Sequence, residues 1–445
     1  MIFPNLTIMK NGISVLLCLL LSISLFAQKS LLQSGPMNGY VTFKEAVIWV
    51  QTTESAKVTA VYWTEENPTE KLRTTPVITS KASAFAATLL ADKVLPGQTY
   101  HYYLEINNVK IELDYPCKIY VPELWQWRTQ PPNFSLLTGS CVYVIEKKYD
   151  RPGKPYGGDY EIFENMAKQD AKLMLWLGDN TYYREVDWDS KTGIYYRNTH
   201  TRSVSELQPL LSSMHHYAIW DDHDFGPNDA VGTFYNKDIT LQAFKDFWAN
   251  PNYDVSSGTG ISGQFSYADI DFFLLDNRWN RTPKYDSAKT KLLGKRQITW
   301  LKSALKNSKA SFKIIMVGGQ FLNPVQVYEN ISNFPKERDA IISFIKSENI
   351  KNVVFLTGDR HHSEISKLTL NEENSIYDIT SSPITSRAHK KLKEENPLRM
   401  KGSAIKERNY AKLSFSGKRG EREIRVEFYS SSNKLLFTEV IRQSK

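Results

Sequence analysis

The chain has little that would suit a membrane-embedded, repetitive or nucleic-acid-binding protein. After an apolar run at residues 13–26, no segment approaches the roughly 20 apolar residues that a transmembrane helix needs. No internal repeat or low-complexity segment stands out, and no known nucleic-acid module or interleaving of aromatic and basic residues is present. We therefore expect neither an integral membrane protein nor dedicated nucleic-acid recognition.

Cysteine is also scarce, with three in 445 residues. Cys18 lies inside the N-terminal apolar run, which leaves Cys117 and Cys141. In an exported protein these two could form a disulfide. Cys141 also follows a strand-like segment, 134–138, through Gly139-Ser140, which makes it a candidate metal ligand. A free buried thiol is the third interpretation.

The N-terminus has the layout of a secretory signal. Lys10 precedes the apolar run at 13–26, and Ala27-Gln28 follows it. The run is too short and too sharply ended for a comfortable membrane span. We expect a signal peptide at residues 1–27 with cleavage near Ala27, and a mature protein that is periplasmic or secreted.

Length and charge set broad limits. A chain of 445 residues suggests about two to three domains at ~150 residues each. The net charge is +8 and the isoelectric point is near 9.0. This basic excess fits a plain solvated surface, and it also fits attraction of anionic substrates or of an anionic envelope polymer.

Residues 28–130 have an all-β pattern. Segments 39–52 and 56–65 alternate or run apolar at strand length, and 95–104 is a turn followed by a strand rich in tyrosine. Several short strands over about a hundred residues indicate an immunoglobulin or fibronectin III-like β-sandwich. The linker 125–133 ends in Pro131-Pro132, which cannot continue a strand. A second domain is predicted at 131–445.

From residue 134 onward, strand and helix patterns alternate, which predicts an α/β fold. Residues 182–201 are polar and tyrosine-rich, and we expect an excursion over the active face there. The predicted strands are 134–138, 173–177, 217–220, a hairpin at 264–276, 313–317, 352–357 and a final hairpin at 423–430 and 435–441. The predicted helices are 160–169, capped by Asp159, 239–250, 294–307 and 335–346.

The residues that follow the predicted strand 173–177 give the first indication of a functional site. This continuous apolar run predicts a strand buried on both faces, and it leads directly into Gly178-Asp179. The same pattern recurs at Gly358-Asp359, and the 217–220 strand leads into Asp221-Asp222-His223. Open α/β sheets place ligands at the carboxyl ends of their strands. Together these ends predict a metal site supplied by several strands.

The candidate ligands combine sulfur, nitrogen and oxygen donors. Such a mixture suits a transition metal, and the surplus of carboxylates allows a second, harder ion such as calcium. Two ions can clamp a phosphoryl group and generate a hydroxide nucleophile. Asp179 is the candidate for the bridging ligand. The other candidates are Cys141, Asp221, Asp222, Asp359 and His361.

At these residues the chain resembles the PhoD-like phosphatases and phosphodiesterases, a branch of the calcineurin-like metallophosphoesterases. The resemblance covers nearly all of the chain after the signal. Its most specific motifs are Gly178-Asp179-x-x-Tyr182, Trp220-Asp221-Asp222-His223 and Gly358-Asp359-x-His361. It implies a four-layer α/β/β/α catalytic core whose metal centre contains iron and, in some members, calcium.

Carried over by position, the resemblance places Cys141, Asp179, Tyr182 and His361 around the iron. It implies that Asp179 bridges to the second ion, with Asp222 and Asp359 around that ion. It also implies that His223 touches the phosphate and protonates the leaving oxygen. The separate histidine that the wider superfamily keeps between these motifs has no clear match, and Gln320 stands near its expected place.

Several of these residues have a plainer interpretation. Tyr182 could be one more surface tyrosine, and His223 could be a salt-bridged histidine. Arg360 could hold a phosphate oxygen by a forked contact or could form a structural salt bridge. Packing or supporting roles are favoured for the remaining candidates, His215, His216, His362, Asp224, Asn228 and Asp229.

We therefore expect an exported metal-dependent phosphoric ester hydrolase that uses a metal-activated hydroxide on a phosphate ester. A phosphodiester is the first choice of substrate and a monoester the second. One alternative keeps the metals but acts as a phosphotriesterase or phospholipase D-like enzyme. The other is a non-catalytic exported protein that binds an envelope component on a degenerate scaffold.

Overall fold

The structure is a computed structural model that describes residues 31–283, 290–392 and 394–444. The predicted signal peptide therefore lies outside the described residues. Within those ranges, no helix combines the length and apolar character needed to cross a bilayer.

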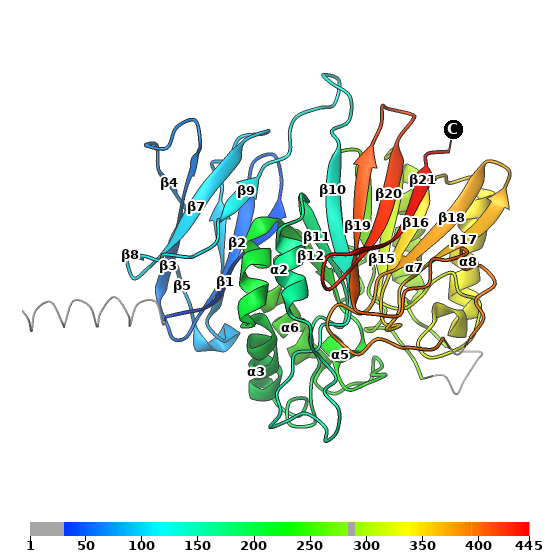
Figure 1. Ribbon diagram of the computed structural model, residues 1–445, viewed down its shortest axis with the longest axis horizontal. Coiled ribbons are helices and arrows are strands. Elements are labelled where there is room, and N and C mark those ends of the chain that lie inside the picture. Colours follow the sequence, from blue (N-terminus) through cyan, green and yellow to red (C-terminus); the bar gives the residue numbers. More distant parts are fainter. Residues whose placement is uncertain (1–30, 284–289, 393, 445) are drawn as a thin grey trace, which may run out of the picture.

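The N-terminal part of the described chain is built from antiparallel strands in two sheets (Figure 1). Burial alternates along the strand 99–106, where Tyr100, Tyr102, Leu104 and Ile106 are buried, and this period of two explains its β structure. One sheet has the order β1(Leu32–Val41), β2(Ala46–Thr52), β6(Ala86–Ala91). The other contains β3(Lys57–Thr64), β4(Leu72–Arg73), β5(Val77–Ile78), β7(Thr99–Ile106), β8(Val109–Lys110) and β9(Lys118–Tyr120). The predicted all-β region is thus observed.

Two six-stranded mixed sheets follow. In the first, β10, β11 and β12 run parallel, and the later strands are antiparallel. Its order is β12(His215–Ile219), β11(Leu173–Leu177), β10(Phe134–Gly139), β19(Asn409–Ser416), β20(Glu423–Ser430), β21(Leu435–Arg442). The second has the order β13(Gly263–Tyr267), β14(Ile270–Leu274), β15(Phe312–Val317), β16(Val353–Thr357), β18(Asn374–Thr380), β17(Glu364–Asn371).

The two six-stranded sheets share one hydrophobic core. Leu136 and Leu175 of the first sheet lie in the same buried cluster as Ile314 and Leu356 of the second. A separate cluster contains Phe273, Ile315 and Phe355 with the buried residues of α7(Lys295–Asn307) and α8(Pro335–Ser347). The opposite side carries α2(Glu161–Ala167), α3(Lys191–Arg202), α4(Gln208–Ser213), α5(Asp222–Phe225) and α6(Lys237–Phe247) (Figure 1). Short 3₁₀ turns lie at Lys81–Ser83, Ser205–Leu207 and Ile331–Asn333. The mixed α/β fold predicted from the sequence is observed.

One predicted segment differs from the structure. Residues 182–201 were expected to form an excursion, but α3 occupies Lys191–Arg202. The buried surface of this helix is mixed, because it includes Arg197, whose guanidinium pairs with Asp187 and Glu146 at 2.7 Å each, beside Ile194 and Tyr195. Apolar periodicity therefore could not reveal it.

Two buried histidines tie β12 to its surroundings. His215 Nδ1 lies 2.8 Å from the Gly39 carbonyl oxygen of β1, and its Nε2 accepts the Tyr120 amide at 3.2 Å. His216 Nδ1 accepts the indole N–H of Trp176 at 2.9 Å, and its Nε2 lies 3.1 Å from the Leu210 carbonyl oxygen. Each ring therefore uses one nitrogen as donor and the other as acceptor, which only a neutral imidazole can do. Burial lowers the pKa of His215 to about 4 and that of His216 to about 3.

We expect His215 and His216 to lower the stability of the folded protein as the pH is lowered from 7 to 5. The unfolded histidines take up protons near their ordinary pKa of 6.5, whereas the folded ones stay neutral until their lower pKa values. Each then contributes a loss of about 2 kcal/mol in the free energy of unfolding at pH 5. Chemical denaturation should therefore show that acidification from pH 7 to 5 destabilises a His215→Asn variant by about 2 kcal/mol less than the parent. An equal change in both proteins would contradict this account.

Candidate metal centre

The site forms where the ends of several strands meet. Asp179 lies two residues after β11, and Asp222 begins α5 just beyond β12, which is parallel to β11. Gly178 allows the end of β11 to approach the end of β12 closely, because a Cβ atom at residue 178 would lie 2.7 Å from Asp221 Cβ. In the second sheet, Gly358 lets the end of β16 approach the end of β10, because a Cβ atom at residue 358 would lie 2.6 Å from Ser140 Oγ. Bulkier residues at either glycine would push the strand ends apart.

The backbone is held in an unusual conformation at these strand ends. Cys141, Asp179, Asp359 and His361 have φ angles of 64°, 53°, 68° and 53°. This left-handed region is uncommon for residues other than glycine, and it costs of order 1–3 kcal/mol per residue. Such strain persists where the surroundings hold it, and it gathers at functional sites. Here it turns the side chains of three strand ends toward one point.

The first group of donors consists of Cys141, Asp179, Tyr182 and His361. One ligand atom each from Cys141, Asp179 and His361 lies within 4.8 Å of the others. The Tyr182 hydroxyl donates to Asp179 Oδ2 at 3.0 Å and lies 3.4 Å from His361 Nε2. All four side chains are buried. The structure thus brings together the set that the resemblance placed around one ion.

His361 turns its Nε2 toward this group, where that nitrogen also lies 3.4 Å from Ser386 Oγ. Its Nδ1 lies 2.9 Å from the Arg387 carbonyl oxygen, so Nδ1 carries the hydrogen and Nε2 faces Tyr182 without one. Burial lowers the pKa of His361 to about 3, so the ring is neutral. The Tyr156 hydroxyl also lies 3.2 Å from Nδ1. A second contact of this kind is how proteins orient a metal-binding histidine.

The second group consists of carboxylates. Asp221, Asp222 and Asp359 offer oxygens within 4.8 Å of one another, and Asp179 shares a similar group with Asp222 and His223. Burial, followed by the charges of Asp222 and Asp221, holds the pKa of Asp179 well above its usual range. Asp221 Oδ2 and Asp222 Oδ1 are buried without a hydrogen-bond partner among the described residues. Crowded, partnerless carboxylate oxygens fit a bound cation.

The two groups fit different ions. Sulfur, nitrogen and phenol oxygen donors in the first group suit a transition metal, and the oxygens of the second suit a hard cation. Asp179 belongs to both groups, as a bridging residue must.

Two of the predicted site residues have other partners. Arg360 Nη1 donates to Gln320 at 2.5 Å and to Asn330 at 2.7 Å, and the guanidinium forms a buried ion pair with Glu394. Of the two interpretations of Arg360, these contacts match the structural salt bridge and not the forked phosphate contact. Asp221 Oδ1 accepts from Asn277 at 2.8 Å and from Arg278 Nε at 2.6 Å, so one of its oxygens is already used.

The weaker histidine candidates lie apart from the donor groups. His215 and His216 serve β12 packing as described above, and His362 Nε2 lies 3.2 Å from Glu364. Cys117 and Cys141 are free buried thiols, so the disulfide alternative is wrong.

Sequence reasoning missed Arg278 and Glu329. Arg278 is fully buried and forms ion pairs with Asp221 and Glu329, with Asp222 Oδ1 at 3.7 Å. Glu329 lies in a third acidic group with Asp222 and Asp229. A signal for Arg278 was present, because β14 runs parallel to β15 and ends just before Asp276-Asn277-Arg278 at the same sheet edge. Glu329 lies in a loop and carries no comparable signal.

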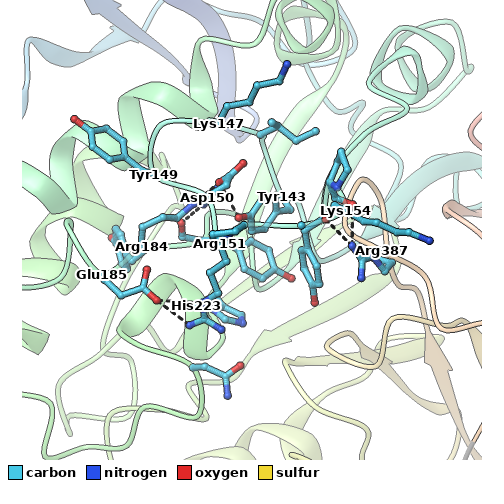
Figure 2. Close-up of a pocket in the computed structure, with 18 of the residues that line it drawn as sticks. Tyr143, Lys147, Tyr149, Asp150, Arg151, Lys154, Arg184, Glu185, His223 and Arg387 are labelled. Atoms are coloured by element: carbon cyan, nitrogen blue, oxygen red, sulfur yellow. Dashed lines mark hydrogen bonds and ion pairs between the residues drawn. The ribbon is translucent and has the colours of Figure 1, made fainter.

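A cavity of about 750 Å³ opens over the centre, and Figure 2 shows its lining. Tyr182 and His223 both line it, with ring centroids 4.1 Å apart and ring planes inclined by 33°. His223 Nε2 lies 4.0 Å from Asp222 Oδ2, and its side chain is 20% exposed. Burial lowers the pKa of His223, whereas the charge of Asp222 opposes that shift. His223 is therefore the titratable side chain that links the buried donors to the cavity.

Comparison with known proteins gives two family matches. The model of the PhoD-like phosphatases matches residues 140–432, and a domain family of unknown function matches residues 29–120. Alkaline phosphatase D of Bacillus subtilis is 27% identical over 268 residues, which cover 49% of this chain and 46% of that protein. The match thus spans about half the length of this curated relative.

Two solved structures share the fold. A structure of PhoD has a TM-score of 0.74 at 19% identity and covers 93% of this chain and 91% of its own. The yellow lupin (Lupinus luteus) purple acid phosphatase PPD1 has a TM-score of 0.67 at 12% identity, with 92% and 74% covered. The strand-end motifs lie inside the region that the family model matches. The chain therefore belongs to the PhoD-like phosphatase family.

Proposed function

We propose that the protein is an exported, metal-dependent phosphoric ester hydrolase of the alkaline phosphatase D type that prefers phosphodiesters to monoesters. The convergence of Cys141, Asp179, Tyr182 and His361 beneath an open cavity supports this proposal most directly. Iron is the proposed ion of this group. Calcium is proposed for Asp222 and Asp359, with Asp221 beside it.

The finer fold assignment belongs to the same proposal. We assign the two six-stranded sheets and their helices to a four-layer α/β/β/α sandwich, and the N-terminal strands to an immunoglobulin or fibronectin III-like sandwich. The shared core between the sheets and the helices on each outer side support the first assignment. The predicted domain boundary near residue 130 stays a prediction.

Paired metal ions, when bound, supply a hydroxide nucleophile near neutral pH and neutralise charge on the phosphoryl oxygens. The protein's own residues orient the site and supply the proton for the leaving oxygen. The Arg387 carbonyl fixes the His361 ring, and the Asp224 carboxylate accepts the amides of Asn180 and Thr181 to hold the loop after Asp179. His223 is placed to donate a proton to the leaving oxygen. The cavity, far larger than a phosphoryl group, accommodates ester substituents.

The proposal is tested on natively exported protein that no chelator has touched. We expect stoichiometric iron, a broad visible absorption from its tyrosinate or thiolate ligand, and faster hydrolysis of bis(p-nitrophenyl) phosphate than of p-nitrophenyl phosphate. N-terminal sequencing should begin at Gln28. A protein without metal that hydrolyses neither ester after iron and calcium are supplied would instead support the non-catalytic binding protein.

The role of His223 predicts a dependence on the leaving group. His223→Asn should lower kcat about 10²- to 10⁴-fold for an alkyl phosphodiester, because an alkoxide needs a proton to leave. The loss should be much smaller with p-nitrophenolate, which leaves without one. Steady-state kinetics with both esters measure the difference, and metal content serves as the control for folding. Equal losses on both substrates would contradict proton donation by His223.

A further inference from the structure

The segment 380–383, Thr-Ser-Ser-Pro, brings a further strand end to the metal centre. It follows β18, which runs parallel to β16, so both strands finish at the same edge of the second sheet. The chain then crosses to the first sheet, where the amide of Ile384 donates to the Ser140 carbonyl oxygen at 2.8 Å. Ser381 and Ser382 are fully buried. Two buried serines therefore lie where the ends of the two sheets meet.

The hydroxyl of Ser382 contacts two of the candidate iron ligands. The backbone N–H of His361 lies 2.9 Å from Ser382 Oγ, and Cys141 Sγ lies 3.2 Å from the same oxygen. An amide can only donate, so Oγ accepts from His361 and its own single hydrogen remains available. Among the described residues, Cys141 Sγ is the one acceptor within hydrogen-bond distance of this hydroxyl. The hydroxyl hydrogen of Ser382 is therefore directed at the sulfur.

The other polar neighbours of this sulfur, within the ranges that the structure describes, do not donate to it. Ser140 Oγ lies 3.4 Å away, but its hydrogen goes to the Ser381 carbonyl oxygen at 2.9 Å. Asp179 Oδ2 lies 3.5 Å away and, as a carboxylate, can only accept. The Tyr182 hydroxyl donates to that carboxylate. The cysteine is fully buried, so bulk solvent does not supply a donor in place of Ser382.

A thiolate that accepts a hydrogen bond donates less charge to the ion that it binds. Hydrogen bonds to ligand sulfurs are among the factors that set the reduction potential of an iron site. We propose that Ser382 is a positioning residue of the metal centre, whose hydroxyl donates to the Cys141 thiolate and tunes the iron through it. Because the same oxygen accepts the amide of His361, Ser382 also fixes these two ligands relative to each other. The inference rests on the proposed function and its iron site.

The test compares the iron-loaded parent with Ser382→Ala, with elemental analysis to show that both hold iron. Without the hydrogen bond the sulfur keeps more negative charge, which favours oxidised iron. Redox titration should show the ratio of oxidised to reduced iron at a fixed applied potential rising on the order of tenfold, because a hydrogen bond to a charged group is lost. The sulfur-to-iron absorption should move to longer wavelength.

An isotope experiment on the parent tests the same hydrogen bond without a substitution. Protein kept in D2O before iron is supplied carries deuterium on its exchangeable hydroxyl groups. Raman spectra excited in the sulfur-to-iron absorption report the metal–sulfur stretching vibrations. We expect these frequencies to differ between H2O and D2O in the parent and to coincide in Ser382→Ala. The parent result holds even if the alanine variant does not fold.

The matched controls are Ser381→Ala and Ser140→Ala. Each removes a fully buried serine hydroxyl near the same strand ends. The Ser381 hydroxyl donates to the Thr138 carbonyl oxygen at 3.0 Å, and that of Ser140 donates to the Ser381 carbonyl oxygen. Both variants should therefore keep the parent's absorption, redox ratio and isotope shift. Ser382→Thr retains a hydroxyl and should keep them as well.

The outcomes separate the role of Ser382 from the proposed function. A parent without the isotope shift, or a redox ratio and absorption unchanged in Ser382→Ala, would overturn the role of Ser382 and leave the hydrolase standing. An equal change in Ser140→Ala would also overturn it, because proximity of any hydroxyl would then suffice. A parent that takes up no iron, or whose spectrum lacks metal–sulfur vibrations, would instead overturn the proposed iron site itself.

Discussion

Asp179→Asn is expected to remove both metal binding and turnover. Asp179 is the residue common to the two donor groups, so its loss weakens both ions together. We expect kcat/KM to fall on the order of 10³-fold or more, at least the cost of losing one preorganised electrostatic group. Elemental analysis should show less than stoichiometric iron, and the visible absorption should be lost. Retained activity in this variant would refute a centre with a bridging aspartate.

The same substitution should stabilise the metal-free protein. Burial and the neighbouring carboxylates, Asp222 first, hold the pKa of Asp179 well above its ordinary range, so its charge is unfavourable without a cation. A neutral amide removes that cost. Thermal unfolding after chelation should therefore give a higher Tm for Asp179→Asn than for the parent. Added metal should raise the Tm of the parent only.

A buried aspartate outside the centre gives the matched control. Asp378 accepts hydrogen bonds from the amides of Phe321 and Leu322 and from Thr357, each within 2.8 Å. Asp378→Asn should lower the Tm and leave the metal content unchanged, because it breaks satisfied contacts instead of relieving repulsion. If both variants change Tm in the same direction, the electrostatic account of the centre is wrong.

The meeting of the strand-end residues could be predicted because local sequence and topology agree there. An apolar run followed by Gly178-Asp179 or Gly358-Asp359 specifies a buried strand and a sharp turn, and parallel strands bring their carboxyl ends to one sheet edge. The motif residue Tyr182 follows Asp179 closely enough to share its loop. The left-handed backbone of Cys141 could not be predicted, since cysteine is not among the residue types that favour it.

The counter-charges around the centre could not be predicted from local pattern. Arg278 and Glu329 reach the Asp221-Asp222 pair from separate loops, and only the folded chain brings them together. The same holds for Arg360, whose neighbours Gln320, Asn330 and Glu394 come from distant segments. Sequence patterns identify which side chains an element presents. They do not identify which charges two loops will pair.

Arg278→Met should produce the largest loss of stability. Arg278 is fully buried and contacts Asp221, Asp222 and Glu329, so its removal takes the counter-charge from Asp221 and Asp222, while Glu329 keeps its ion pair with Arg281. Breaking a buried ion pair from one side costs about 3–5 kcal/mol, and we expect that loss in the free energy of unfolding of the chelated protein. Urea denaturation measures it. In contrast, Arg73→Met, which breaks the exposed pair with Glu105, should cost less than about 1 kcal/mol.

A double substitution separates lost pairing from lost packing. If uncompensated charge causes the destabilisation, adding Asp221→Asn to Arg278→Met should restore part of the stability, because the carboxylate that has lost its ion-pair partner is neutralised. If lost packing causes it, the two changes should add. Metal should also rescue Arg278→Met more than the parent, since a cation bound by Asp222 replaces part of the missing positive charge. An additive double mutant with no extra rescue by metal would mean that Arg278 fills space in the core and does not balance the carboxylates of the centre.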